Sequence, residues 1–190
     1  MYPELLKHIK TYISITSDDE QLITDSFALV KLKKKELLLE PGKICKGHCF
    51  VVRGCMRMYF INNKLTEQIT HFGLENWWIA DYDSLLNQKP SVYYMQAVEA
   101  CELLLISPQN RDLLLKAIPQ LETYFRIIFE KAAISAQRRI HFISGMSDEE
   151  RYRDFSRLFP WFIQRVPQYM VASYLGFTPQ FLSRIRAKKA

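Results

Sequence analysis

Hydrophobic residues recur along this chain with two different periods. Between residues 29 and 106, short runs of alternating apolar and polar side chains are separated by turn residues such as Pro41-Gly42 and Asn62-Asn63. A period of two is typical of strands that bury one face. The runs predict strands at 29–33, 36–39, 50–52, 56–61, 66–72, 93–98 and 102–106. Short strands at this spacing favour an antiparallel β-roll or jelly roll within an α+β fold.

On both sides of this region the period is that of a helix. Short helices are predicted over 3–13, 17–27 and 108–116, and a longer one over 119–143. Ser17 and Glu20 have the spacing of a helix-capping box, and Ser147 and Glu150 repeat it before a helix that runs through Phe159. The residues expected in the core of the C-terminal helices are Tyr152, Phe155, Leu158, Trp161, Phe162 and Val166.

The long helix carries an apolar stripe whose members step by three and four residues. They are Leu121, Phe125, Ile128, Ala132, Ser135 and Ala136, and Phe129 widens the stripe. A helix with such a stripe needs a surface to pack against. Either the stripe packs on the chain's own β-roll, or it pairs with a second copy, and periodicity alone does not distinguish the two.

The stretch from Pro167 to Arg186 has the residue spacing of a helix-turn-helix. This motif needs a small residue where two helices cross and a glycine at the turn, which Ala172 and Gly176 provide. Pro167 can begin the first helix because its missing N–H would have had no partner there. The apolar residues expected to hold the pair to its own core are Val171, Leu175, Leu182 and Ile185.

The second helix of the motif presents a polar face. Thr178 can cap this helix and Pro179 suits its first position, while Phe181 is expected to turn inward. Gln180, Ser183 and Arg184 share the opposite face, and Arg186, Lys188 and Lys189 follow. Arginine pairs with guanine and glutamine with adenine in the major groove, so this face predicts DNA binding, although an ordinary helical hairpin with a solvated basic side would also fit.

The charge distribution separates the two ends of the chain. The formal net charge is +6, yet residues 1–150 hold 18 Lys and Arg against 19 Asp and Glu, whereas residues 151–190 hold 8 against 1. A basic end next to a near-neutral body indicates a polyanionic partner. Arg151, Arg153 and Arg157 are further candidates for contacts with it.

The sequence predicts a cytoplasmic protein without a membrane contact. No apolar run approaches the ~20 residues of a membrane helix, and the N-terminus lacks the core of a signal peptide. The cytosol keeps cysteines reduced, so Cys45, Cys49, Cys55 and Cys101 are expected to be thiols.

A β-roll, a long helix and a helix-turn-helix follow one another in the order that the Crp/Fnr superfamily of transcription regulators shows, and the chain resembles it nearly end to end. Its similarity is greatest to a short-tailed branch. The segments that carry it are Phe50–Gly54, Phe72, Trp78–Asp81, Pro90-Ser91, Glu99, Glu150–Tyr152, Ala172–Gly176 and Leu182–Arg186. The last two are the most specific, since a β-roll alone is shared by many functions.

The resemblance implies a homodimer that binds a roughly palindromic site in double-stranded DNA. It implies a sensor domain over 1–118, a dimerisation helix over 119–145 and a DNA-binding domain over 146–190. Positions matching Gln180, Ser183 and Arg184 face base edges in the family, and Gln168 and Thr178 match positions at the DNA backbone. RNA polymerase is a further partner that the resemblance leaves open.

Two family ligands are not expected. Cyclic-nucleotide-binding members carry Gly-Glu and then an arginine for the phosphate, where this chain has Ala80-Asp81 and Ser91-Val92-Tyr93. The four cysteines match the count of an iron–sulfur site, but three of them fall inside the predicted β-roll, where cysteines are usually apolar packing. Neither cyclic AMP nor an iron–sulfur cluster is therefore predicted.

An unidentified effector would lie in the β-roll. The residues expected to line its pocket are Phe72, Trp78, Asp81, Ser91 and Tyr93, although the aromatic side chains could equally fill the core. A small-molecule sensor that acts through protein contacts is the alternative function. A metal-dependent cupin-like enzyme is disfavoured because His8, His48, His71 and His141 form no ligand cluster in the sequence.

Overall fold

The computed structural model describes residues 2–187, with the side chain of Arg186 left out of the description. The chain forms two compact units. The first comprises the residues up to Tyr59 together with Phe72–Phe129, and the second comprises Phe60–His71 together with the residues from Glu130 onward. The hairpin of strands β4 (Met56–Ile61) and β5 (Glu67–Gly73) contributes to both units.

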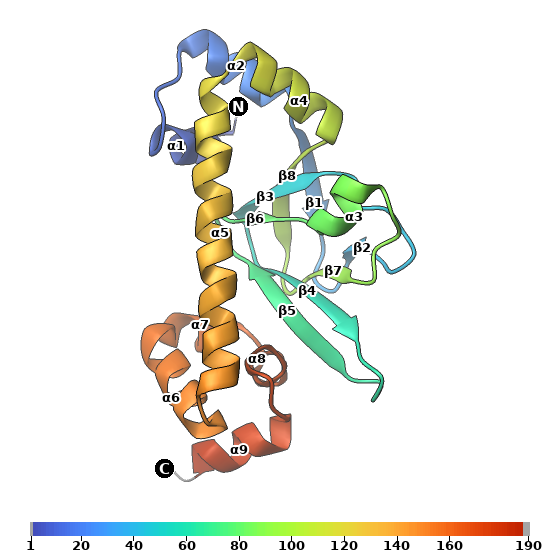
Figure 1. Cartoon of the computed structure of the whole chain (residues 1–190), viewed down its shortest axis with the longest axis vertical. Helices are drawn as coiled ribbons and strands as arrows, with labels where there is room; N and C mark the ends of the chain where they lie inside the picture. Colours follow the sequence, from blue (N-terminus) through green and yellow to red (C-terminus); the bar gives the residue numbers. More distant parts are fainter. Residues whose placement is uncertain (1, 188–190) are drawn as a thin grey trace. The chain divides into compact units, whose positions relative to one another are not determined.

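The strands form two four-stranded sheets, which belong to the first unit except for the end of β4 and most of β5 (Figure 1). One sheet has the order β1-β8-β3-β6 and the other β2-β7-β4-β5. Every strand pair with a described register is antiparallel, so the predicted β-roll is confirmed. The remaining strands are β1 (Ala28–Leu32), β2 (Leu37–Leu39), β3 (His48–Arg53), β6 (Trp78–Ile79), β7 (Tyr94–Ala97) and β8 (Cys101–Ile106).

Alternate residues of the central strand β3 serve two separate cores, as the period of two requires. Cys49 and Val51 pack between the two sheets with residues such as Met56 and Met95. Phe50 points to the other side, where helices cover the sheet. These helices are α1 (Pro3–Lys10), α2 (Ser17–Asp25), α4 (Pro108–Ala117) and the first turns of α5 (Gln120–Gly145). The short helix α3 (Tyr82–Asn87) connects β6 to β7.

The second unit contains the rest of α5 and a series of short helices. They are α6 (Asp148–Leu158), α7 (Pro160–Arg165), α8 (Gln168–Leu175) and α9 (Pro179–Ala187). Phe155 and Phe162 meet edge to face, with ring centroids 5.6 Å apart. Both are buried, as is Val166, and the Phe155 ring also meets the ring of Tyr174 in α8, 5.9 Å away.

The predicted helix starts agree with the structure better than the predicted burial of individual residues does. The capping box of α6 is confirmed, since Ser147 and Glu150 exchange side-chain and backbone bonds. The capping box of α2 lies one residue earlier than predicted, because Thr16 and Asp19 supply it. Leu158 and Trp161 are exposed rather than buried. They lie where α6 ends and α7 begins, and the inward side of that turn is taken by the Phe155–Phe162 contact.

The apolar stripe of α5 is divided along its length. Leu121, Tyr124 and Phe125 are buried in the core beneath the first sheet, so the start of the stripe packs on the chain's own β-roll. Residues 130–138 are all exposed. No helix of the described residues is long and apolar enough to cross a membrane.

Candidate nucleic-acid interface

Helices α8 and α9 form the predicted helix-turn-helix (Figure 1). Ala172 and Leu175 of α8 and Leu182 and Ile185 of α9 are buried, which confirms the residues expected to pin the pair. Gly176 ends α8 at a φ of +86°, where L side chains are strained, and a Cβ there would lie 3.2 Å from the Arg151 guanidinium. The turn therefore depends on glycine.

The start of α9 is fixed by its cap. The Thr178 hydroxyl accepts a hydrogen bond from the amide of Phe181 at 3.2 Å, and Pro179 begins the helix, as the sequence predicts. Phe181 is half-buried against the ring of Phe177, 5.7 Å away. A capped and pinned helix presents its outer face in a fixed orientation.

Three of the predicted DNA-binding residues lie exposed on this outer face: Gln180, Ser183 and Arg184. The Ser183 hydroxyl donates to the carbonyl of Pro179 at 3.1 Å, which leaves its oxygen as an acceptor. The Arg184 guanidinium lies 5.4 Å from the ring centre of Phe181 and is otherwise turned to solvent. Lys188 and the side chain of Arg186 lie outside the described residues.

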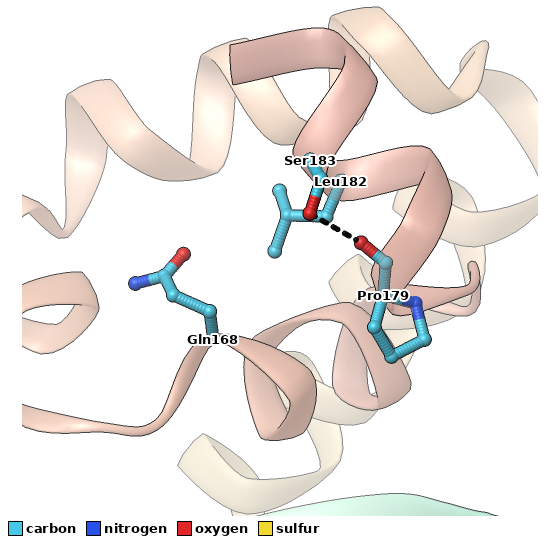
Figure 2. Close-up of a pocket in the computed structure, with 4 residues that line it drawn as sticks. All are labelled: Gln168, Pro179, Leu182 and Ser183. Carbon is cyan, nitrogen blue, oxygen red and sulfur yellow. Dashed lines mark hydrogen bonds between the residues drawn. The ribbon is translucent and has the colours of Figure 1, made fainter. Parts of the chain in front are cut away.

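Gln168 lies at the start of α8, beside this face. Its amide nitrogen donates to the carbonyl of Ile163 at 3.0 Å, and its side-chain oxygen is buried with no hydrogen-bond partner among the described residues. Gln168 lines a cavity of about 390 Å³ together with Pro179, Leu182 and Ser183 (Figure 2). The hollow thus lies between the first helix of the motif and the polar face of the second.

Arg151 does not belong to this face, and its expected role in DNA contact is wrong. Its side chain is buried, and its guanidinium donates to the carbonyls of Leu175, Ile143 and Met146. These are carbonyls near the C-terminal ends of α8 and α5, where helix carbonyls lack internal partners. Arg151 therefore holds the motif to the end of the long helix, a role that its position in a charged segment does not reveal.

The residues expected around an effector are divided among three places in the β-roll. Trp78 packs in the core beneath the first sheet, and its indole N–H donates to the hydroxyl of Tyr124 at 2.8 Å. Asp81 and Ser91 lie together elsewhere: the Ser91 hydroxyl donates to the Asp81 carboxylate at 2.6 Å and accepts from the amide of Tyr93 at 2.9 Å. Phe72 is buried where β5 ends.

Asp81 occupies the N-terminus of α3. Its carboxylate accepts a hydrogen bond from the amide of Ser84 at 3.2 Å, as a helix cap does. The Ser84 hydroxyl in turn accepts from the amide of Cys45 and donates to the carbonyl of Lys89. Asp81, Ser84 and Ser91 are all at least 95% buried, with exposed fractions of 5%, 1% and 4%.

This arrangement does not fit a cyclic phosphate. A phosphate bound at a helix N-terminus needs that position free and a cation beside it. Here the position holds a buried carboxylate, and the segment from Trp78 to Ala97 contains no arginine. A second anion beside Asp81 would be repelled.

The four cysteines are buried, each in contacts of the β-roll. Burial raises the pKa of Cys45 and of Cys49, and it raises the pKa of Cys101 to about 11. Metal ligation needs thiolates, which burial disfavours. No group of three or more His, Cys, Asp or Glu side chains suited to a metal ion occurs among residues 2–187.

Comparisons with known proteins agree with this architecture. Residues 29–117 match the cyclic nucleotide-binding domain family. A comparison with curated proteins finds no match. Among solved structures, the chain is similar to the c-di-GMP-responsive global regulator CLP of Xanthomonas campestris, with a TM-score of 0.73, 12% identity, and coverage of 92% of this chain and 91% of that one.

Two further solved structures share the fold. One is a protein of Eubacterium rectale described as a transcriptional regulator of the Crp/Fnr family, with a TM-score of 0.70, 15% identity and coverage of 92% and 83%. The other is the catabolite activator protein of Thermus thermophilus, with a TM-score of 0.58, 16% identity and coverage of 92% and 84%. The domain match and the shared fold agree with the Crp/Fnr superfamily, as the sequence resemblance predicts.

Proposed function

We propose that this chain, which has the β-roll and the fold of the Crp/Fnr regulators, is a transcription regulator that binds double-stranded DNA through α9 as a homodimer. One observation carries the proposal. The exposed face formed by Gln180, Ser183 and Arg184 stands on a helix that is capped at Thr178 and pinned by buried Leu182. Recognition helices of helix-turn-helix proteins have this construction.

The chemistry of the face suits base edges in the major groove. The Arg184 guanidinium can donate two hydrogen bonds to guanine, and the Gln180 amide can pair with adenine. Because the Ser183 hydroxyl already donates to Pro179, its oxygen can accept from the amino group of cytosine or adenine. Residues 151–190 contain 8 Lys and Arg and 1 acidic residue, and this positive charge attracts the phosphates of DNA.

The proposed dimer forms through the exposed middle of α5. A single helix-turn-helix makes few contacts and binds weakly, whereas two copies on a palindromic site add their contacts. The exposed part of the stripe, at Ala132, Ser135 and Ala136, offers small residues that let a second helix approach closely. The two recognition helices would then meet half-sites about one DNA turn, ~34 Å, apart.

We further propose that the chain acts in the cytoplasm and is a regulator rather than an enzyme. The likeness of the fold to solved regulators supports this. His48 is 2% exposed, and its ring nitrogen lies 2.8 Å from the guanidinium of Arg111, so this histidine is a hydrogen-bonded residue of the core.

The experiment that tests the proposed function measures binding of fluorescent DNA duplexes by the wild-type chain and by Arg184→Ala. Loss of a base contact should weaken binding to a preferred site by ~1–3 kcal/mol and relax the preference at one base position. Lys116→Ala, which removes the same charge from an exposed position of α4, is the matched control and should leave the preference unchanged. Equal binding of all duplexes by the wild-type chain would contradict the proposal.

A further inference from the structure

Strand β5 is the edge strand of the second sheet, so the backbone groups on its outer side have no strand partner. In an antiparallel pair, every second residue directs both its N–H and its C=O to the same side. The outward groups of β5 include the carbonyl of Glu67 and both groups of Ile69. Side chains of the second unit, rather than another strand, bind them.

Ser173 of α8 binds two of these groups with one hydroxyl. Its oxygen accepts from the amide of Ile69 at 2.9 Å, and the hydroxyl donates to the carbonyl of Glu67 at 2.6 Å. A third hydrogen bond runs from the strand to the helix: the side-chain amide nitrogen of Gln68 donates to the carbonyl of Ser173 at 2.6 Å. One residue of the helix-turn-helix therefore takes the place of a neighbouring strand.

Arg139 of α5 binds the third group. Its guanidinium donates to the carbonyl of Ile69 and to the carbonyl of Tyr174, both at 3.0 Å, and lies 4.6 Å from the centre of the Tyr174 ring. Burial lowers the pKa of Arg139, and the two carbonyls and the ring face compensate part of that cost. Arg139 thus joins α5, β5 and α8 at one point.

The same contacts complete the C-terminal end of α8. The last carbonyls of a helix lack the partners of its interior, and in α8 three successive ones accept from long side chains of other elements. The carbonyl of Ser173 also accepts from the amide of Gly176 at 3.2 Å. Gln68 of β5 binds the carbonyl of Ser173, Arg139 of α5 that of Tyr174, and Arg151 of α6 that of Leu175. Two of the three donors are cations, which the negative end of a helix favours.

From this geometry we infer that the free edge of β5 is a docking surface for the helix-turn-helix, and that Ser173 and Arg139 are positioning residues for DNA binding. This inference rests on the proposed function. Ser173 and Tyr174 lie just before the turn at Gly176, and α8 packs against α9, with Ala172 and Leu182 both buried. Fixing the end of α8 fixes the recognition face, so a dimer reaches both half-sites without first ordering its motifs.

The test compares Ser173→Ala with two other variants of the full chain. Ser173→Thr keeps the hydroxyl, and Ser156→Ala removes a hydroxyl that donates within α6, to the carbonyl of Tyr152 at 2.6 Å. Two quantities are measured well below the melting temperature: the affinity for a preferred DNA duplex, and the hydrogen-exchange rate of the Ile69 amide.

We expect Ser173→Ala to accelerate exchange at Ile69 and to weaken DNA binding roughly fivefold or more, with the order of preference among duplexes unchanged. Ser173→Thr should restore both quantities, and Ser156→Ala should change neither. A purely structural contact would lower the melting temperature and leave the affinity of the folded chain as it is. Wild-type affinity in Ser173→Ala overturns the inference alone, whereas a wild-type chain without a preferred duplex overturns the proposed function and the inference with it.

Discussion

The carboxylate of Asp81 accepts a hydrogen bond from the hydroxyl of Ser91 over 2.6 Å, and the same carboxylate caps α3. Both side chains are buried, so this pair joins two segments of the β-roll that are ten residues apart. The two residues stand at positions where the sequence resemblance would lead one to expect phosphate-binding residues, and neither is a cation.

Removing this carboxylate should destabilise the first unit. Asp81→Ala loses the helix cap and leaves the buried hydroxyl of Ser91 without its acceptor, so the free energy of unfolding should fall by about 2 kcal/mol or more. Denaturation in urea measures it. Asp83→Ala, which removes a carboxylate from the exposed side of α3, should remain close to the wild-type chain. Equal stability of the two variants would show that the buried pair contributes nothing.

Cyclic AMP should not stabilise the wild-type chain. A ligand that binds only the folded state raises the melting temperature as its concentration exceeds the dissociation constant. Because a carboxylate already occupies the N-terminus of α3, we expect no shift in a thermal melt up to millimolar nucleotide. A saturable rise would mean that the Asp81–Ser91 pair opens to admit a phosphate.

The sequence predicted the helices and strands better than the way in which they pack against one another. The strands and most helices follow from the periods of two and 3.6, because one buried face fixes each period. The turn at Gly176 and the start of α9 at Pro179 were predicted, since Thr178, Pro179 and Gly176 act on the backbone nearest to them, whereas α8 begins one residue later than expected, at Gln168. In contrast, Leu158 and Trp161 are exposed because the packing of α7 decides which side of the chain is inward.

The docking of the motif could not be predicted from residue types. Ser173 bonds to residues more than one hundred positions away, and a serine in the last turn of a short helix gives no signal of such a partner. Arg151 stood among basic residues, so its sequence context indicated DNA, yet it is buried among helix carbonyls. Long-range hydrogen bonds depend on the tertiary structure and leave no local pattern.

Stability should depend on pH through buried histidines. Burial, with a smaller effect of the Arg111 guanidinium, lowers the pKa of His48 from 6.5 to about 4. Between pH 4 and pH 6.5 the unfolded chain then binds more protons than the folded chain. The free energy of unfolding therefore has its full value above pH 6.5 and falls as the pH drops toward 4. At roughly 1.4 kcal/mol per pKa unit, protonation of His48 lowers the free energy of unfolding by at most about 3–4 kcal/mol.

Urea denaturation across this pH range checks the histidine prediction. His48→Gln keeps an acceptor for Arg111 and cannot be protonated, so its free energy of unfolding should fall less steeply. The slope that remains belongs in part to His71, whose pKa burial also lowers to about 4. An identical slope in His48→Gln and the wild-type chain would rule out this role for His48.

A charge placed on the exposed stripe of α5 should separate the two copies. In Ala132→Glu, a carboxylate would be buried without a partner at the helix pair, a loss of several kcal/mol that should weaken the dimer at least about a hundredfold. Ala133→Glu adds the same charge to the next face of the helix, where residue 133 is also exposed, and is the matched control. Light scattering measures the mass in solution. A wild-type chain that is a monomer at micromolar concentration would refute the dimer.

The most direct test of the central claim is to select bound duplexes from random DNA with the wild-type chain and to measure the mass of the complex on the enriched site. The proposed regulator should enrich a roughly palindromic sequence with half-sites about one turn apart and hold two chains per duplex. Enrichment of no sequence, or a complex with one chain on an asymmetric site, would contradict it.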